Sequence, residues 1–147
     1  MRSVVVGAFG AEPRLQRLAC ASGISDRVRF LGWQADLGGL LAASDIYCQP
    51  NTGPEPFGLA FVEALYAGLP VVGTPLGGPA EIITEGCGVL VPPDDPAALA
   101  DALAALIADP GRRARLGGEG PARARALCDP DVVQRRLRDV LVGLVRP

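Results

Sequence analysis

Residues 45–73 read DIYCQPNTGPEPFGLAFVEALYAGLPVVG, and this stretch decides the fold. Asp45–Gln49 is a short apolar run that a proline ends, which predicts a strand. Gly58–Ala67 carries apolar residues at helical spacing and is followed by Gly68, a residue type that often terminates helices, so we expect a helix. Pro70–Gly73 predicts the next strand. A strand, a helix and another strand in succession are typical of a parallel βα unit.

The same alternation extends on both sides of this stretch. We expect further strands at Ser3–Gly7, Arg27–Leu31 and Gly88–Val91, and helices at Pro13–Ser22, Asp36–Ser44 and Pro79–Thr84. The remaining segments are predicted to be helical, at Ala97–Ala108 after the capping pair Asp95–Pro96, at Gly118–Leu127 and at Val132–Val145. About five strands in this rhythm predict an α/β fold with a Rossmann-like open parallel sheet and a helical C-terminal segment. Ligands of such sheets bind beyond the carboxyl ends of the strands.

The length and composition of the chain limit the classes of protein to which it can belong. The 147 residues, 49% of them hydrophobic and 20% charged, predict a single globular domain over residues 1–147. The 14 basic residues are all arginine and face 16 acids, so a net charge of −2 argues against nucleic-acid binding. The chain has no histidine, which excludes Ser/His/Asp and Cys/His nucleophilic centres and His-ligated metal sites within it.

The cysteines and the N-terminus indicate the compartment. Cys20, Cys48, Cys87 and Cys128 are far apart and form no CxxC pair, so we expect four buried thiols in a reducing cytoplasm rather than a disulfide or a metal site. The apolar run at Val4–Val6 is too short for a signal peptide, and no stretch reaches the length of a membrane span. A cytoplasmic protein is therefore expected.

Two acids flank a helix start within the stretch quoted above. Glu55 lies in the loop and Glu63 on the helix, while the backbone N–H groups near Phe57, Gly58 and Leu59 form the positive end of that helix. A phosphate can bind there, and each carboxylate can accept two hydroxyl hydrogen bonds. Acids on both sides of a phosphate site suit a molecule with hydroxyls at both ends and phosphates between them. A nucleoside-diphosphate sugar is such a molecule.

The alternative is that Glu55 is an ordinary loop residue and Glu63 a solvated helix acid. Periodicity argues against this for Glu63, because Leu59, Val62, Leu65 and their neighbours make the helix apolar nearly all round. Glu63 is therefore expected to sit among buried neighbours, where an unpaired acid would be costly.

The segment EPFGLAFVEALYAGLPVV, with its E-x7-E spacing, resembles the signature of the group 1 (family 4) glycosyltransferases, retaining enzymes of the GT-B fold. The likeness extends over almost the whole chain. Further matching blocks, in the family's order, are Val4–Gly7 with Pro13–Leu15, Asp26–Gly32 (DRVRFLG), Gly77–Ile82 (GGPAEI) and Gly88–Pro93 (GVLVPP).

The resemblance implies a role for each of these residues. Glu63 would bind the ribose diol, and Glu55 would contact the transferred sugar as the candidate catalytic residue. The amides of Phe57, Gly58 and Leu59 would lie near the distal phosphate. It further implies that the donor substrate is a nucleoside-diphosphate sugar and that no metal cofactor is needed.

The family also implies a base-side loop after the strand that ends in FLG, here Gly32, Trp33 and Gln34. Trp33 has an alternative interpretation, because the only tryptophan of a chain is more often a packing residue.

The chain also departs from the family pattern. GT-B enzymes have two Rossmann-like domains with the active site between them, and the resemblance covers only most of the second, nucleotide-sugar domain. That domain's first strand and its arginine- and lysine-bearing loop are unmatched, which predicts a gap between the strands Ser3–Gly7 and Asp45–Gln49. We therefore expect a missing N-terminal, acceptor-binding half or a partner polypeptide that completes the sheet.

Other motifs have simpler explanations. Asp129–Asp131 spells a D-x-D metal motif but lies between two helices, so capping of the last helix is expected. Gly7–Gly10 lacks the G-x-G-x-x-G spacing and is expected to be a tight turn. Acids are interspersed among the arginines of the C-terminal helices, so solvation of these helices is favoured over binding of anionic lipid or an acidic acceptor. Membrane association is thus not indicated.

Two functions remain open at this stage. In the first, the chain is the donor-binding part of a retaining glycosyltransferase and is inactive in isolation. In the second, it is a non-catalytic module that binds a nucleotide sugar, or that completes or regulates another transferase.

Overall fold

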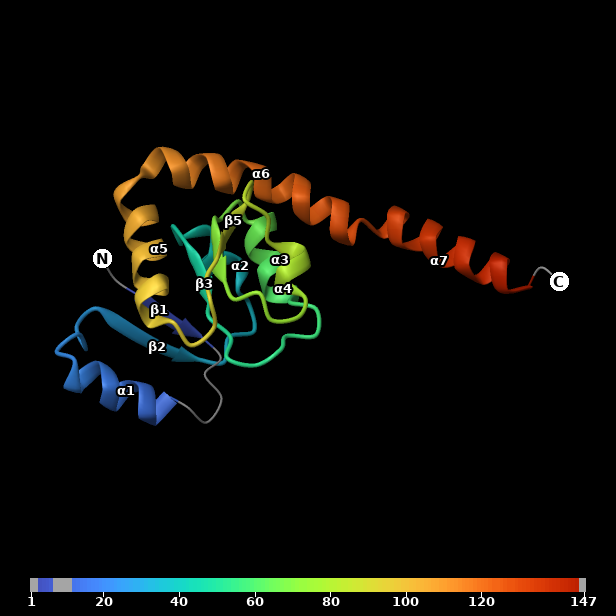
Figure 1. Cartoon of the computed structure of the whole chain (residues 1–147). Coiled ribbons are helices and arrows are strands. Elements are labelled where there is room, and N and C mark those ends of the chain that lie inside the picture. The colour runs from blue at the N-terminus through green and yellow to red at the C-terminus, as the bar shows by residue number, and fades with distance from the viewer. Residues whose placement is uncertain (1–2, 7–11, 146–147) are drawn as a thin grey trace. The chain divides into compact units, whose positions relative to one another are not determined.

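A computed structural model describes residues 3–6 and 12–145 of the chain (Figure 1). The chain divides into two compact units, Met1–Leu40 and Leu41–Pro147. The strands are β1 (Ser3–Val6), β2 (Val28–Gly32), β3 (Tyr47–Gln49), β4 (Val71–Gly73) and β5 (Gly88–Leu90). The helices are α1 (Glu12–Ala21), α2 (Gly38–Ala42), α3 (Leu59–Tyr66), α4 (Pro79–Ile82), α5 (Pro96–Ala108), α6 (Pro110–Cys128) and α7 (Pro130–Val145). Every predicted α/β element is present, with bounds shifted by a few residues except in α6.

The first unit is a βαβ arrangement. β1 pairs in parallel with β2, and α1 connects them. Gly23, directly after the predicted helix Pro13–Ser22, adopts a left-handed conformation (φ 65°) and ends α1. Its N–H donates to the Cys20 carbonyl and that of Ile24 donates to the Ala19 carbonyl, both at 3.0 Å, which is the Schellman arrangement.

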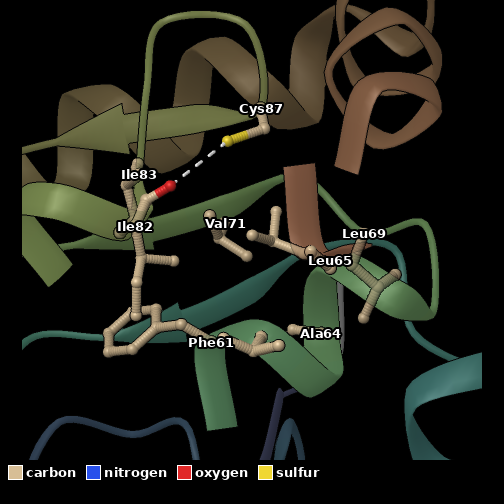
Figure 2. Packing of buried hydrophobic residues seen from close by; sticks show 10 residues of the cluster. Phe61, Ala64, Leu65, Leu69, Val71, Ile82, Ile83 and Cys87 are labelled. Atoms are coloured by element: carbon tan, nitrogen blue, oxygen red, sulfur yellow. Dashed lines mark hydrogen bonds between the residues drawn. The ribbon is translucent and has the colours of Figure 1, made fainter. Parts of the chain in front are cut away.

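The second unit is built on a three-stranded parallel sheet in the order β3-β4-β5. Side chains of β4 alternate between two apolar clusters, because successive residues of a strand point to opposite faces. Val71 packs with residues of α3 and α4, and Figure 2 shows the Phe61 ring of α3 beside Ile82 of α4 in this cluster. Val72 packs on the other side with Leu106 and Leu116 of α5 and α6.

The strands do not form one sheet among the described residues. β1 and β2 form one hydrogen-bonded sheet, and β3, β4 and β5 form another. The parallel α/β class is thus confirmed. The sequence also predicted a gap between the strands now seen as β1 and β3; these strands belong to different sheets, and the gap itself stays a prediction.

The C-terminal helices begin at three Asp-Pro pairs. The Asp95 carboxylate accepts from the Ala98 N–H at 2.9 Å, and Asp129 accepts from Asp131 and Val132, so the predicted capping roles are confirmed. The predicted start of the middle helix at Gly118 is wrong: α6 begins at Pro110. There Asp109 accepts from the Arg112 N–H at 2.8 Å and provides the same cap.

The prediction of four buried thiols is also wrong. None of the four cysteines is in a disulfide, but only Cys87 is buried, whereas Cys128 is half-buried and Cys20 and Cys48 are exposed. The Cys87 thiol lies 4.0 Å from the Ile82 carbonyl (Figure 2). In the described part of the chain, no helix combines the length and the apolar composition that crossing a membrane requires.

Candidate functional site

The loop that follows β3 is fixed by backbone hydrogen bonds to the segment that follows β4. The Glu55 N–H donates to the Leu76 carbonyl at 3.0 Å, and the Gly78 N–H donates to the Glu55 carbonyl at 2.8 Å. Thr74, which is 2% exposed, donates its hydroxyl to the Asn51 carbonyl at 2.8 Å. Both the backbone N–H and the backbone carbonyl of Glu55 are therefore hydrogen-bonded to the segment after β4.

Two glycines permit this close approach. A methyl group on Gly77 would lie 2.3 Å from the Glu55 carbonyl oxygen, and one on Gly78 would lie 1.8 Å from the Phe57 carbonyl oxygen. No other residue type fits at either position without a backbone shift. The Gly77–Gly78 pair thus sets where the Glu55 loop lies.

The start of α3 carries uncapped backbone donors. Gly58 precedes the helix in a left-handed conformation (φ 99°), and no side chain caps the helix there. The first N–H groups of a helix have no partner within it and carry a partial positive charge. Phe57 and Leu59, which flank Gly58, are 44% and 65% exposed. This helix start is suited to an anion.

Glu55 and Glu63 both influence the ionisation of Tyr47. Burial raises the pKa of Tyr47 to about 12, and the negative charges of Glu63 and Glu55 add to that increase. In sequence, the two acids lie on either side of the α3 start. That both face one donor site stays a prediction.

The predicted burial of Glu63 is wrong. Phe61, Val62, Ala64 and Leu65 form the buried face of α3, whereas Glu63 is exposed. Leu59 and Tyr66 lie four residues before and three after Glu63, so all three share the opposite face. Leu59 and Tyr66 are 65% and 44% exposed. Apolar residues of α3 thus lie both on its buried face and on the solvent-exposed face that carries Glu63.

Sequence reasoning missed a row of hydrogen-bonded polar side chains along β3 and the start of the loop that follows it. The Tyr47 hydroxyl donates to the Gln49 amide oxygen at 2.5 Å, and the Gln49 amide nitrogen donates to the Asn51 amide oxygen at 3.1 Å. Asn51 Nδ2 is buried and has no hydrogen-bond partner within the described structure. The signal was present as polar residues at alternate positions 47, 49 and 51, which is the spacing of one strand face.

The predicted base-side residues belong to the other compact unit. Gly32 is left-handed (φ 62°), and the Gln34 amide nitrogen donates to the Leu31 carbonyl at 2.7 Å. Trp33, for which packing was the alternative to base contact, is 69% exposed.

The D-x-D motif is part of a helix cap. Asp129 and Asp131 lie at the junction of α6 and α7, where Asp129 caps a helix. The Gly7–Gly10 motif lies outside the described residues. Within residues 3–6 and 12–145 no group of three or more His, Cys, Asp or Glu side chains is placed to hold a metal ion.

Comparison with known proteins identifies the family. Residues 1–123 match the sequence profile of the family described as "Glycosyl transferases group 1". The chain is 43% identical over 108 residues to a phosphatidyl-myo-inositol mannosyltransferase of Mycobacterium leprae, covering 71% of this chain and 29% of that one. It is 44% identical over 114 residues to a D-inositol 3-phosphate glycosyltransferase of Salinispora tropica, covering 76% of this chain and 23% of that one.

A solved structure agrees with this result. The crystal structure of Anabaena Alr3699/HepE in complex with UDP-glucose superposes with a TM-score of 0.86 and 31% sequence identity, covering 97% of this chain and 41% of that one. The chain thus spans between about a quarter and two fifths of the length of these proteins. The resemblance that the E-x7-E segment indicated is confirmed, and the chain belongs to the group 1 glycosyl transferase family.

Proposed function

We propose that the chain is the donor-binding part of a retaining glycosyltransferase and binds a nucleoside-diphosphate sugar through the start of α3. The observation that carries the proposal is the uncapped start of α3, which Glu55 and Glu63 flank in sequence; both acids also raise the pKa of Tyr47. Two acceptor groups with backbone donors between them match the hydroxyl, phosphate, hydroxyl order of a sugar nucleotide.

Each part of the site has a separate role in this proposal. The exposed Glu63 carboxylate accepts the two ribose hydroxyls. The N–H groups of Phe57, Gly58 and Leu59 bind the distal phosphate. When the bond between the anomeric carbon and the phosphate oxygen breaks, negative charge builds on that phosphate, and preorganised N–H donors stabilise it. Glu55 accepts a hydroxyl of the transferred sugar and orients it.

The known relatives support donor binding and suggest where the rest of the reaction takes place. The HepE structure holds UDP-glucose, and the Mycobacterium leprae relative is a mannosyltransferase. Since the chain spans a minority of their length, we propose that an N-terminal half or a partner polypeptide supplies the acceptor site, and that the isolated chain is inactive. Four cysteines without a disulfide fit a reducing, cytoplasmic compartment.

Thermal unfolding of the 147-residue chain tests the proposal. The midpoint is measured alone and with UDP-, GDP-, ADP- and dTDP-sugars. A ligand at 100 times its Kd adds about 2.7 kcal/mol, which for a chain of this size is an increase of about 5–11 °C. One nucleotide class is expected to give this increase, and that class identifies the base.

Two variants make the test specific to the site. Glu63→Ala removes the ribose acceptor and is expected to weaken nucleotide binding by about 1.5–3 kcal/mol, the range for hydrogen bonds to charged groups. Glu85→Ala is the control, because Glu85 is also an exposed glutamate but lies after α4. Equal nucleotide affinity for Glu63→Ala and the unaltered chain would remove the ribose assignment. A cooperative transition that none of the sugars moves would contradict donor binding by this chain.

A further inference from the structure

Two arginines of α6 hold the ends of two earlier helices. Arg113 donates through Nη1 to two carbonyls in the last turn of α5, at 2.7 and 2.9 Å. Arg123 donates through Nε to the Ile82 carbonyl at 3.0 Å and through Nη2 to the Glu81 carbonyl. Both side chains are half-buried, contrary to the expectation that the arginines of these helices only solvate them. Guanidinium-to-carbonyl bonds at a helix end are charge-assisted and favoured by the helix dipole.

The helix that Arg123 holds is the one that fixes Glu55. α4 consists of Pro79–Ile82 only, and Gly78 precedes it as the N-cap. The Gly78 carbonyl accepts from the Glu81 and Ile82 N–H groups at 2.9 and 3.0 Å, while the Gly78 N–H donates to the Glu55 carbonyl at 2.8 Å. Arg123 and Glu55 are thus bonded to opposite ends of one helical turn.

α6 is fixed to α3 as well. A methyl group on Gly120 would lie 2.7 Å from the Leu65 carbonyl oxygen, and one on Gly117 would lie 2.1 Å from the Gly68 carbonyl oxygen, so the two backbones are in close contact. α6 therefore packs directly on α3, the helix that carries Glu63. Through Arg123 it also holds α4, the helical turn that fixes Glu55.

A helix as short as α4 depends on such outside contacts. A single turn forms few internal hydrogen bonds against the entropy of ordering its residues, so short helices are held by tertiary packing. Pro79 and Ile82 are buried in the core, but the terminal carbonyls need donors of their own. Arg123 supplies them.

We propose that Arg123 is a positioning residue for the donor site: through α4 it fixes the Glu55 loop relative to Glu63 on α3. The sugar-binding part of this inference rests on the proposed function. Arg123 itself does not touch the substrate. Arg113 provides a matched control, because it lies on the same helix and makes the same kind of bond to α5, which does not hold the Glu55 loop.

Hydrogen exchange tests the positioning without any ligand. In Arg123→Gln, the Glu55 and Gly78 amides are expected to exchange about tenfold faster or more, since a charge-assisted bond that supports them is lost. Arg113→Gln should leave these two amides unchanged, and Arg123→Lys, which keeps a cationic donor, should restore part of the protection. Unchanged protection in Arg123→Gln, or equal loss in both glutamine variants, would overturn the inference.

Binding measurements then separate positioning from general loss of stability. The readout is the ratio of affinities for a sugar nucleotide and its free diphosphate, with UDP-glucose against UDP and GDP-mannose against GDP. Arg123→Gln is expected to lower this ratio by about tenfold, whereas affinity for the nucleoside diphosphate, whose ribose Glu63 binds, changes no more than in Arg113→Gln. With Glu55 already replaced by Ala, Arg123→Gln should have no further effect on the ratio.

The outcomes distinguish the two proposals. Lack of nucleotide binding by the unaltered chain would contradict the proposed function, while the exchange rates would still decide whether Arg123 fixes the loop. Nucleotide binding with an unchanged ratio in Arg123→Gln would overturn its role in sugar binding alone.

Discussion

Gly78→Ala tests whether the backbone contact beneath Glu55 holds the site. The added methyl would lie 1.8 Å from the Phe57 carbonyl oxygen and 2.4 Å from its carbonyl carbon. Gly78 has φ −50°, which alanine adopts freely, so the cost is steric and not conformational. Since Cβ contacts below 3.0 Å essentially do not occur, the two segments must separate by about 1.2 Å, from 1.8 Å to 3.0 Å.

The magnitude follows from what this separation breaks. The bonds from the Gly78 N–H to the Glu55 carbonyl and from the Glu55 N–H to the Leu76 carbonyl join the same two segments. Overpacking costs about 1–3 kcal/mol and each of the two lost hydrogen bonds about 0.5–1.5 kcal/mol, so we expect a loss of about 2–6 kcal/mol. In a chain of this size that lowers the thermal midpoint by about 4–24 °C.

Urea unfolding of two alanine variants measures the effect. Gly53 lies in the same loop as Glu55, and a methyl group there would meet no atom within 4 Å. Gly53→Ala is therefore expected to change stability by less than about 0.5 kcal/mol. If Gly78→Ala were as stable as Gly53→Ala, the close contact would not hold the loop, and the support assigned to Gly78 would be refuted.

Four further predictions address the charges, a helix start and catalysis. Burial and the nearby carboxylates raise the pKa of Tyr47 from 10.0 to about 12; the unfolded chain loses this proton first, so the free energy of unfolding should fall between pH 10 and 12. Glu63→Gln should lower the Tyr47 pKa in an ultraviolet titration, and an unchanged value would mean that this charge is too distant. Asp109→Ala should cost about 0.5–2 kcal/mol in urea unfolding through loss of the α6 cap, whereas Asp101→Ala, an exposed position within α5, should not. In a transferase that contains this chain, Glu55→Gln should reduce turnover more than nucleotide affinity, and the reverse pattern in steady-state kinetics would exclude its contact with the sugar.

Local signals were sufficient for most of the secondary structure. Gly23 and the pairs Asp95–Pro96 and Asp129–Pro130 end or begin helices through interactions with residues only a few positions away, so short-range chemistry predicted them correctly. The pair at Asp109 carried the same signal. The predicted helix nevertheless began only at Gly118. Glycine and proline disfavour a helix interior, and α6 tolerates Gly117 and Gly120 because they pack closely on the backbone of α3 and of the turn after it.

Exposure in the site was less predictable. Leu59 and Tyr66 make α3 apolar on both faces, and periodicity cannot tell which face meets the sheet. Only packing against β4 and α6 decides that Phe61 and Leu65 are buried and that Glu63 stays open to solvent.

The sequence by itself determined the α/β class, the order of the strands and helices, and the two acids on either side of a helix start. These properties depend on side-chain periodicity and on motifs within a few residues of one another. Tertiary structure decided which segments support the site. Glu55 is held by Gly78, and Gly78 by the helical turn that Arg123 caps from α6. Arg123 and Glu55 are far apart in the chain, and no local pattern specifies such contacts, because they arise only when the helices pack on the sheet.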